Sequence, residues 1–164
     1  MRDLPGTYVL VMLARDPAVV TAGALGTLQV AEGAYLYAGS AFGPGGVRAR
    51  VERHARADKR HRWHVDYLTA VAPVTEAWFT HDSRRQECDW LRALTALRGA
   101  REPWPGFGSS DCGCSSHLIH LRRAPVVGTF RRHLRRVLAR PVPIEIHRFP
   151  GVPAAGPRPL SSSR

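Results

Sequence analysis

The segment from Thr7 to Leu13 constrains the fold more than any other part of this chain. It reads Thr-Tyr-Val-Leu-Val-Met-Leu, with β-branched residues and no alternation of polar and apolar side chains. A strand that exposes one face to water alternates, whereas a strand with this pattern is buried on both faces. We therefore expect a sheet whose two faces are both covered by other elements.

The remaining patterns predict a mixed α/β domain. A hairpin with a short strand near residues 27–30 is expected within 15–33, and further strands over 34–40, 74–80 and 118–121. Helices are expected over 47–56, 64–70, 84–98 and 130–139, the third of them with Ser83 as its N-cap. From residue 150 onward Pro, Gly, Ala and Ser dominate, and we expect a disordered tail over 150–164.

Length and cysteine content favour one domain in a reducing compartment. The 164 residues suffice for a single core. There is no run of about 18 apolar residues that would predict a membrane span, and the charges among the first twenty residues are not those of a secretory signal. Three cysteines form no even disulfide framework, so we expect a cytosolic protein.

Arginine makes the chain strongly basic. It has 24 Lys+Arg against 13 Asp+Glu, a formal net charge of +11, and Lys59 is its only lysine. Guanidinium groups suit phosphate, so a polyanion such as nucleic acid is the expected partner. GC-rich codon usage would explain the scarcity of lysine but not the net charge. We expect Arg48, Arg53, Arg131 and Arg135 to grip phosphates without reading sequence.

Two tyrosines, an arginine and a histidine stand at strand ends and on one helix face. Tyr8 opens the first strand, while Tyr35 and Tyr37 share one face of a later strand. Arg50 and His54 are four residues apart and share a helix face. Taken singly, each tyrosine is typical of a core and the other two of any basic helix. Together they offer a proton relay and a stabiliser of phosphorane charge.

Glu87 falls within the apolar stripe of the third predicted helix, among Trp90, Leu91, Leu94 and Leu97. A buried carboxylate without a partner is costly, and the helix dipole offsets only about 0.3–1 kcal/mol of that cost. Two interpretations stay open. In the first, Glu87 binds a divalent metal ion in a site. In the second, it forms a salt bridge with an arginine, or the start of the helix is frayed and the carboxylate is exposed to solvent.

These motifs, in this order and spacing, resemble those of the GIY-YIG nuclease superfamily: Gly6-Thr7-Tyr8, Tyr37-Ala38-Gly39-Ser40, Arg50 with His54, and Glu87. The chain more closely resembles an uncharacterised bacterial and archaeal branch named DUF123, through residues 35–41, 63–68 and 106–118. In some relatives this module is fused to a DNA-repair glycosylase, which suggests a DNA-repair protein as a partner.

The resemblance implies an α/β fold with a small, mainly antiparallel sheet of three to four strands flanked by helices. Residues 1–123 would form the catalytic domain, with a basic helix and extension over 124–149 packed on it. Tyr8 or Tyr37 would help to deprotonate the attacking water, and Arg50 would neutralise the phosphorane. His54 would relay a proton or bind phosphate, while Glu87 would ligate Mg²⁺ or Mn²⁺.

Two departures from the family pattern concern the same site. Thr7 replaces the usual isoleucine, which we expect to matter little because the adjacent tyrosine carries the chemistry. Many relatives have an asparagine in the loop after the glutamate helix, and this chain contains none. Ser109, Ser110 or Asp111 would have to fill that place, and with Ser40 the two serines are the expected hydrogen-bonding contacts to nucleic acid.

The sequence thus predicts a metal-dependent endonuclease that acts on DNA, in repair. One alternative is a nucleic-acid-binding module that kept the fold and lost turnover. The other is a small scaffold that positions a repair enzyme. Only the nuclease needs Glu87 and the tyrosines.

A second group of residues has the character of zinc ligands. Cys112, Cys114 and His117 offer soft donors at short spacing. Zn²⁺ requires four ligands in a tetrahedron, so a structural zinc site would need one more, from Cys88, His64 or His120. The alternative is a tight loop that lines the active cleft and holds no metal.

Residues 61–67 form a dense polar and aromatic patch. Trp63 beside basic residues could stack on a base. The alternative is a short amphipathic helix in which Trp63 and Tyr67 pack inward and Asp66 caps the helix or pairs with an arginine.

Overall fold

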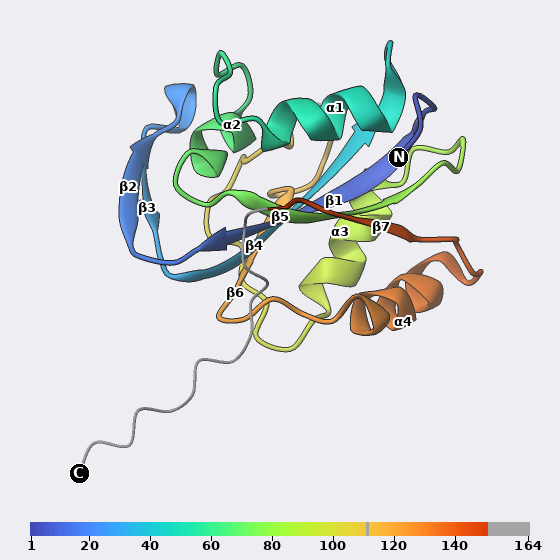
Figure 1. The fold of residues 1–164 in the computed structure, drawn as a ribbon. Coiled ribbons are helices and arrows are strands. Elements are labelled where there is room, and N and C mark those ends of the chain that lie inside the picture. The colour runs from blue at the N-terminus through green and yellow to red at the C-terminus, as the bar shows by residue number, and fades with distance from the viewer. Residues whose placement is uncertain (111, 151–164) are drawn as a thin grey trace.

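The computed structural model describes residues 1–110 and 112–150, which form two sheets and the helices around them (Figure 1). Along the chain the elements are β1 (Gly6–Ala14), β2 (Ala18–Thr21), the short 3₁₀ helix η1 (Gly23–Leu25), β3 (Thr27–Val30), β4 (Gly33–Ala41), α1 (Gly46–Ala55), α2 (His64–Thr69), β5 (Val74–Thr80), α3 (Glu87–Thr95), β6 (Leu118–Leu121), α4 (Val127–Leu138) and β7 (Glu145–Arg148).

One antiparallel sheet of five strands, in the order β6-β4-β1-β5-β7, organises the molecule. The central strand β1 pairs with β4 on one side and with β5 on the other. The strands β2 and β3 form a separate hairpin. The α/β class and the antiparallel sheet are confirmed, but the sheet has five strands rather than three or four, because β7 adds an edge strand beside β5.

Helices cover both faces of this sheet (Figure 1). α1, α2 and the hairpin pack on one face, where Tyr8, Leu10 and Met12 of β1 belong to a first core cluster. α3 and α4 pack on the other face, where Val9 and Val11 belong to a second cluster. Nearly every residue of β1 is buried as a result, which confirms the burial on both faces that its apolar run predicts.

The third helix begins later than its pattern predicts. α3 starts at Glu87 rather than at residue 84, and ends at Thr95 rather than at 98. The backbone N–H of Gln86 donates instead to the side-chain oxygen of Thr7, at 3.2 Å. Ser83 is therefore not the N-cap, because the segment before Glu87 finds its hydrogen bonds outside the helix.

The strand β7 is an element that the sequence did not predict. Its four residues pair with β5, with Ile146 opposite Trp78. Residues 124–149 therefore supply α4 and an edge strand. The tail from 151 and Asp111 lie outside the described residues, so the predictions made for them stay predictions.

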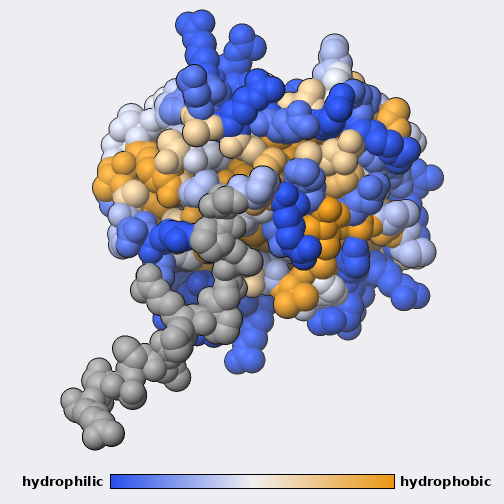
Figure 2. Space-filling model, in the orientation of Figure 1, coloured by the Kyte–Doolittle hydropathy of each residue, from blue (hydrophilic) through white to orange (hydrophobic). Residues whose placement is uncertain are grey.

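Hydrophilic side chains surround smaller apolar patches on the face shown in Figure 2. The large apolar side chains exposed among the described residues are Leu4, Val19, Trp63 and Val126, from four separate segments. In residues 1–110 and 112–150, no helix has both the length and the apolar character that crossing a bilayer requires. Exposed apolar groups are thus scattered rather than gathered.

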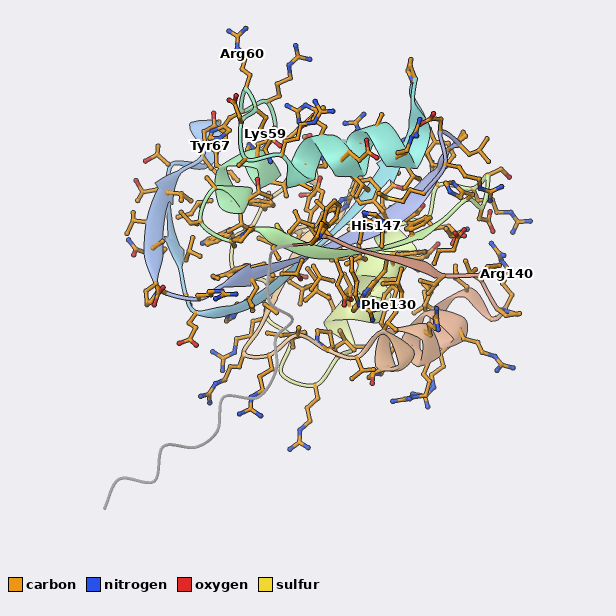
Figure 3. All side chains as sticks on the ribbon, in the orientation of Figure 1. Lys59, Arg60, Tyr67, Phe130, Arg140 and His147 are labelled. Atoms are coloured by element: carbon orange, nitrogen blue, oxygen red, sulfur yellow. The ribbon has the colours of Figure 1, made fainter. Side chains whose placement is uncertain are left out.

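Phe130 anchors α4 to the second core cluster, on the inner side of that helix (Figure 3). Its ring is fully buried, with its centroid 5.4 Å from that of Trp78 and 5.3 Å from that of Trp90.

Phe130→Ala should lower the free energy of unfolding by about 3–5 kcal/mol, because it leaves a cavity. Chemical denaturation measures the loss. Val126→Ala, at a residue that is 74% exposed, should change it by less than about 0.5 kcal/mol. Equal effects of the two substitutions would contradict this packing.

Candidate functional site

One cavity brings together the side chains that the motifs single out. It has a volume of ≈ 530 Å³ and lies where β1 begins and β4 ends. All five predicted catalytic residues line it, together with Ser40 and Ser110: Tyr8, Tyr37, Arg50, His54 and Glu87. Its size is that of an ordinary ligand site, which is about 300–1,000 Å³.

The strand register and two glycines set the positions of the tyrosines. Tyr8 pairs with Gly39 across the sheet, which puts Tyr37 diagonally beside it on the same face. A Cβ atom on Gly39 would lie 2.7 Å from the hydroxyl oxygen of Tyr8. A Cβ atom on Gly108, whose φ is +71°, would lie 2.6 Å from Cε2 of Tyr37. Both rings therefore rest on backbone that only glycine can supply.

Tyr8 is a protonated phenol at neutral pH. Burial raises its pKa well above the usual value of 10.0, and the nearby Tyr37 and the carboxylates of Asp66 and Glu87 raise it further. The positive charge of Arg50 opposes this shift without cancelling it. In this state the hydroxyl of Tyr8 can donate a hydrogen bond into the cavity.

Asp66 holds His54 in place, a role that the sequence did not predict. Nδ1 of His54 lies 3.0 Å from Oδ1 of Asp66, and both side chains are buried. Asp66 also accepts hydrogen bonds from the backbone N–H groups of Arg62 and Trp63 and pairs with Arg53 at 3.1 Å. Burial alone would raise the pKa of Asp66, but these hydrogen bonds hold it well below its usual range. The interpretation of Asp66 as a capping and pairing residue is thus confirmed.

His54 is a neutral imidazole with an accepting nitrogen. Burial lowers its pKa, and the hydrogen bond and charge of Asp66 offset that only in part. Lys59, labelled in Figure 3, lies 3.9 Å from Asp66 and also disfavours a charged imidazole. When Nδ1–H donates to Asp66, Nε2 keeps its lone pair. Its ring centroid is 6.2 Å from that of Tyr8, so a proton acceptor stands beside the phenol.

The guanidinium of Arg50 stacks on the ring of Trp63. The central carbon of Arg50 lies 4.4 Å from the centroid of the Trp63 ring, and that of Arg53 lies 4.2 Å from it. Trp63 is 37% exposed and lines the cavity. The expectation that Trp63 packs inward in an amphipathic helix is wrong, because two cation–π contacts hold its ring at the surface.

Glu87 offers an unsatisfied carboxylate oxygen. Its Oε2 is buried and has no hydrogen-bond partner among the described residues. None of the ion pairs found in that part of the chain includes Glu87, so the alternative of a salt bridge with an arginine is not realised. A buried oxygen of this kind costs about 1–3 kcal/mol or more, and a cation would remove that cost.

Positive charge dominates the lining of the cavity. Arg50, Arg62 and Arg85 line it, and Glu87 supplies its single carboxylate among residues 1–110 and 112–150. Arg85 also donates to the hydroxyl of Ser40, at 3.3 Å. Arg62 and Arg85 were not predicted, because in a chain so rich in arginine their positions carry no distinctive signal.

The other residues predicted to contact nucleic acid do not line this cavity. Arg48 points outward from α1 and pairs with an aspartate near the N-terminus, and Arg53 is engaged by Asp66. Ser109 is buried. Arg131 and Arg135 belong to α4, on the opposite side of the sheet from α1 (Figure 1). Their contacts to nucleic acid stay predictions.

A cluster of soft donors adjoins the cavity. The ligand atoms of Cys88, Cys112, Cys114 and His117 all lie within 4.8 Å of one another. Sγ of Cys112 is 3.1 Å from Nε2 of His117, and both residues line the cavity. Burial raises the pKa of Cys88, and burial together with its two cysteine neighbours raises that of Cys114 to about 12.

Cys88 is the fourth member of this cluster, rather than either candidate histidine. The ring of His120 lies 3.1 Å from the carbonyl oxygen of Glu32. The ring of His64 packs against Phe107, with centroids 5.7 Å apart. The start of α3 and the loop before β6 thus bring the four donors together.

We expect His54 to take up its proton at a lower pH than a free histidine, whose pKa is about 6.5. Asp66→Asn removes a charge that favours the imidazolium, so the midpoint should fall further. NMR titration of the histidine ring protons measures both, with the resonances of His54 assigned from their loss in His54→Gln. Asp58→Asn, at an exposed position, is the matched control. A wild-type midpoint at or above about 6.5 would contradict the assignment.

The same shift predicts how stability depends on pH. Between the lower pKa of folded His54 and about 6.5, the unfolded chain binds more protons, so the free energy of unfolding falls as the pH decreases through that window. His54→Gln should lose this part of the dependence in denaturation curves recorded from pH 7.5 to about 5. An unchanged slope would show that other groups cause it.

A comparison with known protein families identifies the family of this chain. A model of the family described as "Domain of unknown function DUF123" matches residues 7–139. That range contains every residue that lines the cavity. No curated protein and no solved structure matches the chain. The chain therefore belongs to the DUF123 family.

Proposed function

We propose that this protein is a metal-dependent endonuclease that hydrolyses phosphodiester bonds in DNA. The observation that carries the proposal is the buried Oε2 of Glu87, which has no hydrogen-bond partner in the described part of the chain and lies in a cavity lined by two tyrosines and three arginines. Hydrolysis of a phosphodiester requires cationic groups that stabilise the phosphate charge, a group that accepts a proton from the attacking water, and a cation that stabilises the leaving oxygen. This cavity contains residues suited to all three roles.

The residues present fit Mg²⁺ or Mn²⁺ at Glu87. Carboxylate oxygen is the ligand that these hard cations prefer, and they keep several waters, so one protein carboxylate suffices. No other carboxylate lines the cavity among the described residues. When bound, the ion supplies Lewis-acid stabilisation of the phosphate and a more acidic water.

Arg50 is the group best placed to stabilise charge on the phosphate. Its guanidinium is held over Trp63 at 4.4 Å, so it needs little reorganisation when negative charge develops. Arg62 and Arg85 line the same cavity and would bind the phosphate in the ground state.

His54 is the proton acceptor of the site. The buried carboxylate of Asp66 fixes its tautomer, which leaves Nε2 free to accept a proton from water or from a phenol. Tyr8 and Tyr37 would orient the attacking water, and the hydroxyl of Tyr8 would pass a proton to His54. This assigns the basic role to the histidine, with the tyrosines as relay.

The proposed substrate is DNA, and the proposed process is DNA repair. The net charge of +11 favours a polyanion. Arg48, on the outward side of α1, would hold DNA that leaves the cavity, whereas Arg131 and Arg135 would contact only DNA that reaches the other side of the sheet. Ser110 lines the cavity and would take the place of the missing asparagine. The three free cysteines suit the reducing bacterial cytosol or nucleoid, where a DNA-repair protein would be the partner.

Glu87→Gln should lower cleavage at least about 100-fold, because it removes the charge that holds the cation. Supercoiled, branched and single-stranded DNA with Mg²⁺ or Mn²⁺ are the substrates, and gel analysis of the products is the measurement. Glu52→Gln, at an exposed position of α1, is the matched control and should cleave as wild type does.

The binding arm of this experiment separates the alternatives. The wild type and Glu87→Gln should both bind DNA, with a steep loss of affinity as salt rises. Binding without cleavage by either protein would identify a binding module instead of a nuclease. No binding at low salt would favour the scaffold.

Arg50→Ala should slow cleavage by about 10²–10³-fold, because it removes the guanidinium that faces the developing charge. The matched control is Arg56→Ala, an exposed arginine just after the end of α1. Rate measurements at saturating DNA distinguish loss of catalysis from loss of affinity. Equal rates for the two variants would remove Arg50 from the mechanism.

A further inference from the structure

We propose that Cys88, Cys112, Cys114 and His117 bind a structural Zn²⁺ ion that ties the loop before β6 to the first turn of α3. This site does not include the carboxylate of Glu87, although Cys112 and His117 line the same cavity as that residue, and the proposal does not depend on nuclease activity. Its ligands come from two segments that are distant in sequence and meet in the fold.

The distances match a tetrahedral ion after small side-chain shifts. Zn–S and Zn–N bonds of about 2.3 and 2.0 Å place the ligand atoms of a site with three sulfurs and one nitrogen about 3.5–3.8 Å apart. Here all four ligand atoms already lie within 4.8 Å of one another, and one pair is at 3.1 Å. Shifts of about 1 Å in side chains would therefore complete the site.

The chemistry of the donors selects zinc over the cations expected at Glu87. Three sulfur atoms and one imidazole nitrogen are soft or borderline ligands, which suit Zn²⁺ and not Mg²⁺. Four protein ligands also leave no open position for water, as in structural rather than catalytic zinc sites.

The backbone around the cluster is arranged for a thiolate centre. The N–H of Cys114 points at Sγ of Cys112, at 3.5 Å. The N–H of His117 donates to the carbonyl oxygen of Phe107 at 2.7 Å, and its own carbonyl accepts from Ala38 at 3.0 Å. The histidine is thus fixed to β4 on one side and to the loop on the other, so its ring is held beside Cys112.

A disulfide accounts for these residues less completely than zinc does. All three cysteines are free thiols in this structure. Any one disulfide would use two of them and leave the third thiol and His117 without a role. A metal uses all four donors, and the reducing compartment proposed above keeps the thiols available.

The direct test is the metal content of the full chain, purified without chelators. We expect one Zn²⁺ per chain by elemental analysis, and near-complete loss of zinc in Cys88→Ser. His120→Gln, a histidine outside the cluster, and Glu87→Gln, beside it, should both keep the ion. The second control separates this site from the proposed magnesium site.

A spectroscopic test covers the case in which a cysteine variant fails to fold. Protein stripped by a chelator is titrated with Co²⁺ alone, and tetrahedral thiolate ligation is expected to give intense visible bands and a sulfur-to-cobalt charge-transfer band. Added Zn²⁺ should abolish these bands, raise the Tm of the wild-type chain and protect its thiols from alkylation.

Three results would overturn the proposal. One is a wild-type chain that carries little zinc and shows no cobalt–thiolate absorption. Another is full zinc retention in Cys88→Ser, which would exclude the helix from the site. The third is a disulfide found by mass spectrometry in protein isolated under reducing cytosolic conditions.

Discussion

The hydrogen bond from the backbone N–H of Gln86 to the hydroxyl of Thr7 connects the two segments that carry Glu87 and Tyr8. It is 3.2 Å long, both residues are buried, and it joins the start of α3 to the start of β1. Because α3 begins one residue later, Glu87 is delivered beside Tyr8 rather than left in solvent. An isoleucine at position 7 has no hydroxyl for this contact. The expectation that threonine matters little there stays a prediction, and this hydrogen bond is the contact that an isoleucine would lose.

Local periodicity predicted the parts of the site that lie within one element. The two-residue repeat put Tyr35 and Tyr37 on one face of β4, and both belong to or pack against the first core cluster. The helical repeat put Arg50 and His54 on one face of α1, and both reach the cavity. The apolar run of β1 required cover on both faces. Such patterns contain no information on distances between elements. Only the family resemblance therefore predicted that these faces of β1, β4 and α1 line one cavity.

Contacts between elements are what the sequence could not supply. Asp66 reaches His54 across twelve residues and a loop, so no helical spacing marks the pair. Cys88 meets the loop cysteines because α3 packs against β4 and β6, a contact between parts of the chain that are distant in sequence. The strand β7 has a single apolar residue, Ile146, and an edge strand of this kind carries little hydrophobic signal. The late start of α3 has a similar cause, because polar partners outside the helix compete for its first N–H groups.

Adjacent positions on α3 carry ligand atoms that suit two different kinds of metal ion. Neighbouring residues of a helix point about 100° apart, so Glu87 and Cys88 face different parts of one site, in which Cys112 and His117 line the cavity beside Glu87. The carboxylate faces arginines and phenols, where a hard cation and phosphate would bind. The thiol faces two further sulfurs and an imidazole, which suit a soft tetrahedral ion. Zn²⁺ binds thiolates in preference to a single carboxylate. The cysteine cluster would therefore bind zinc and leave the carboxylate of Glu87 available for Mg²⁺. The same zinc ion would hold the first turn of the helix, and hence the acid, against the loop that closes the cavity.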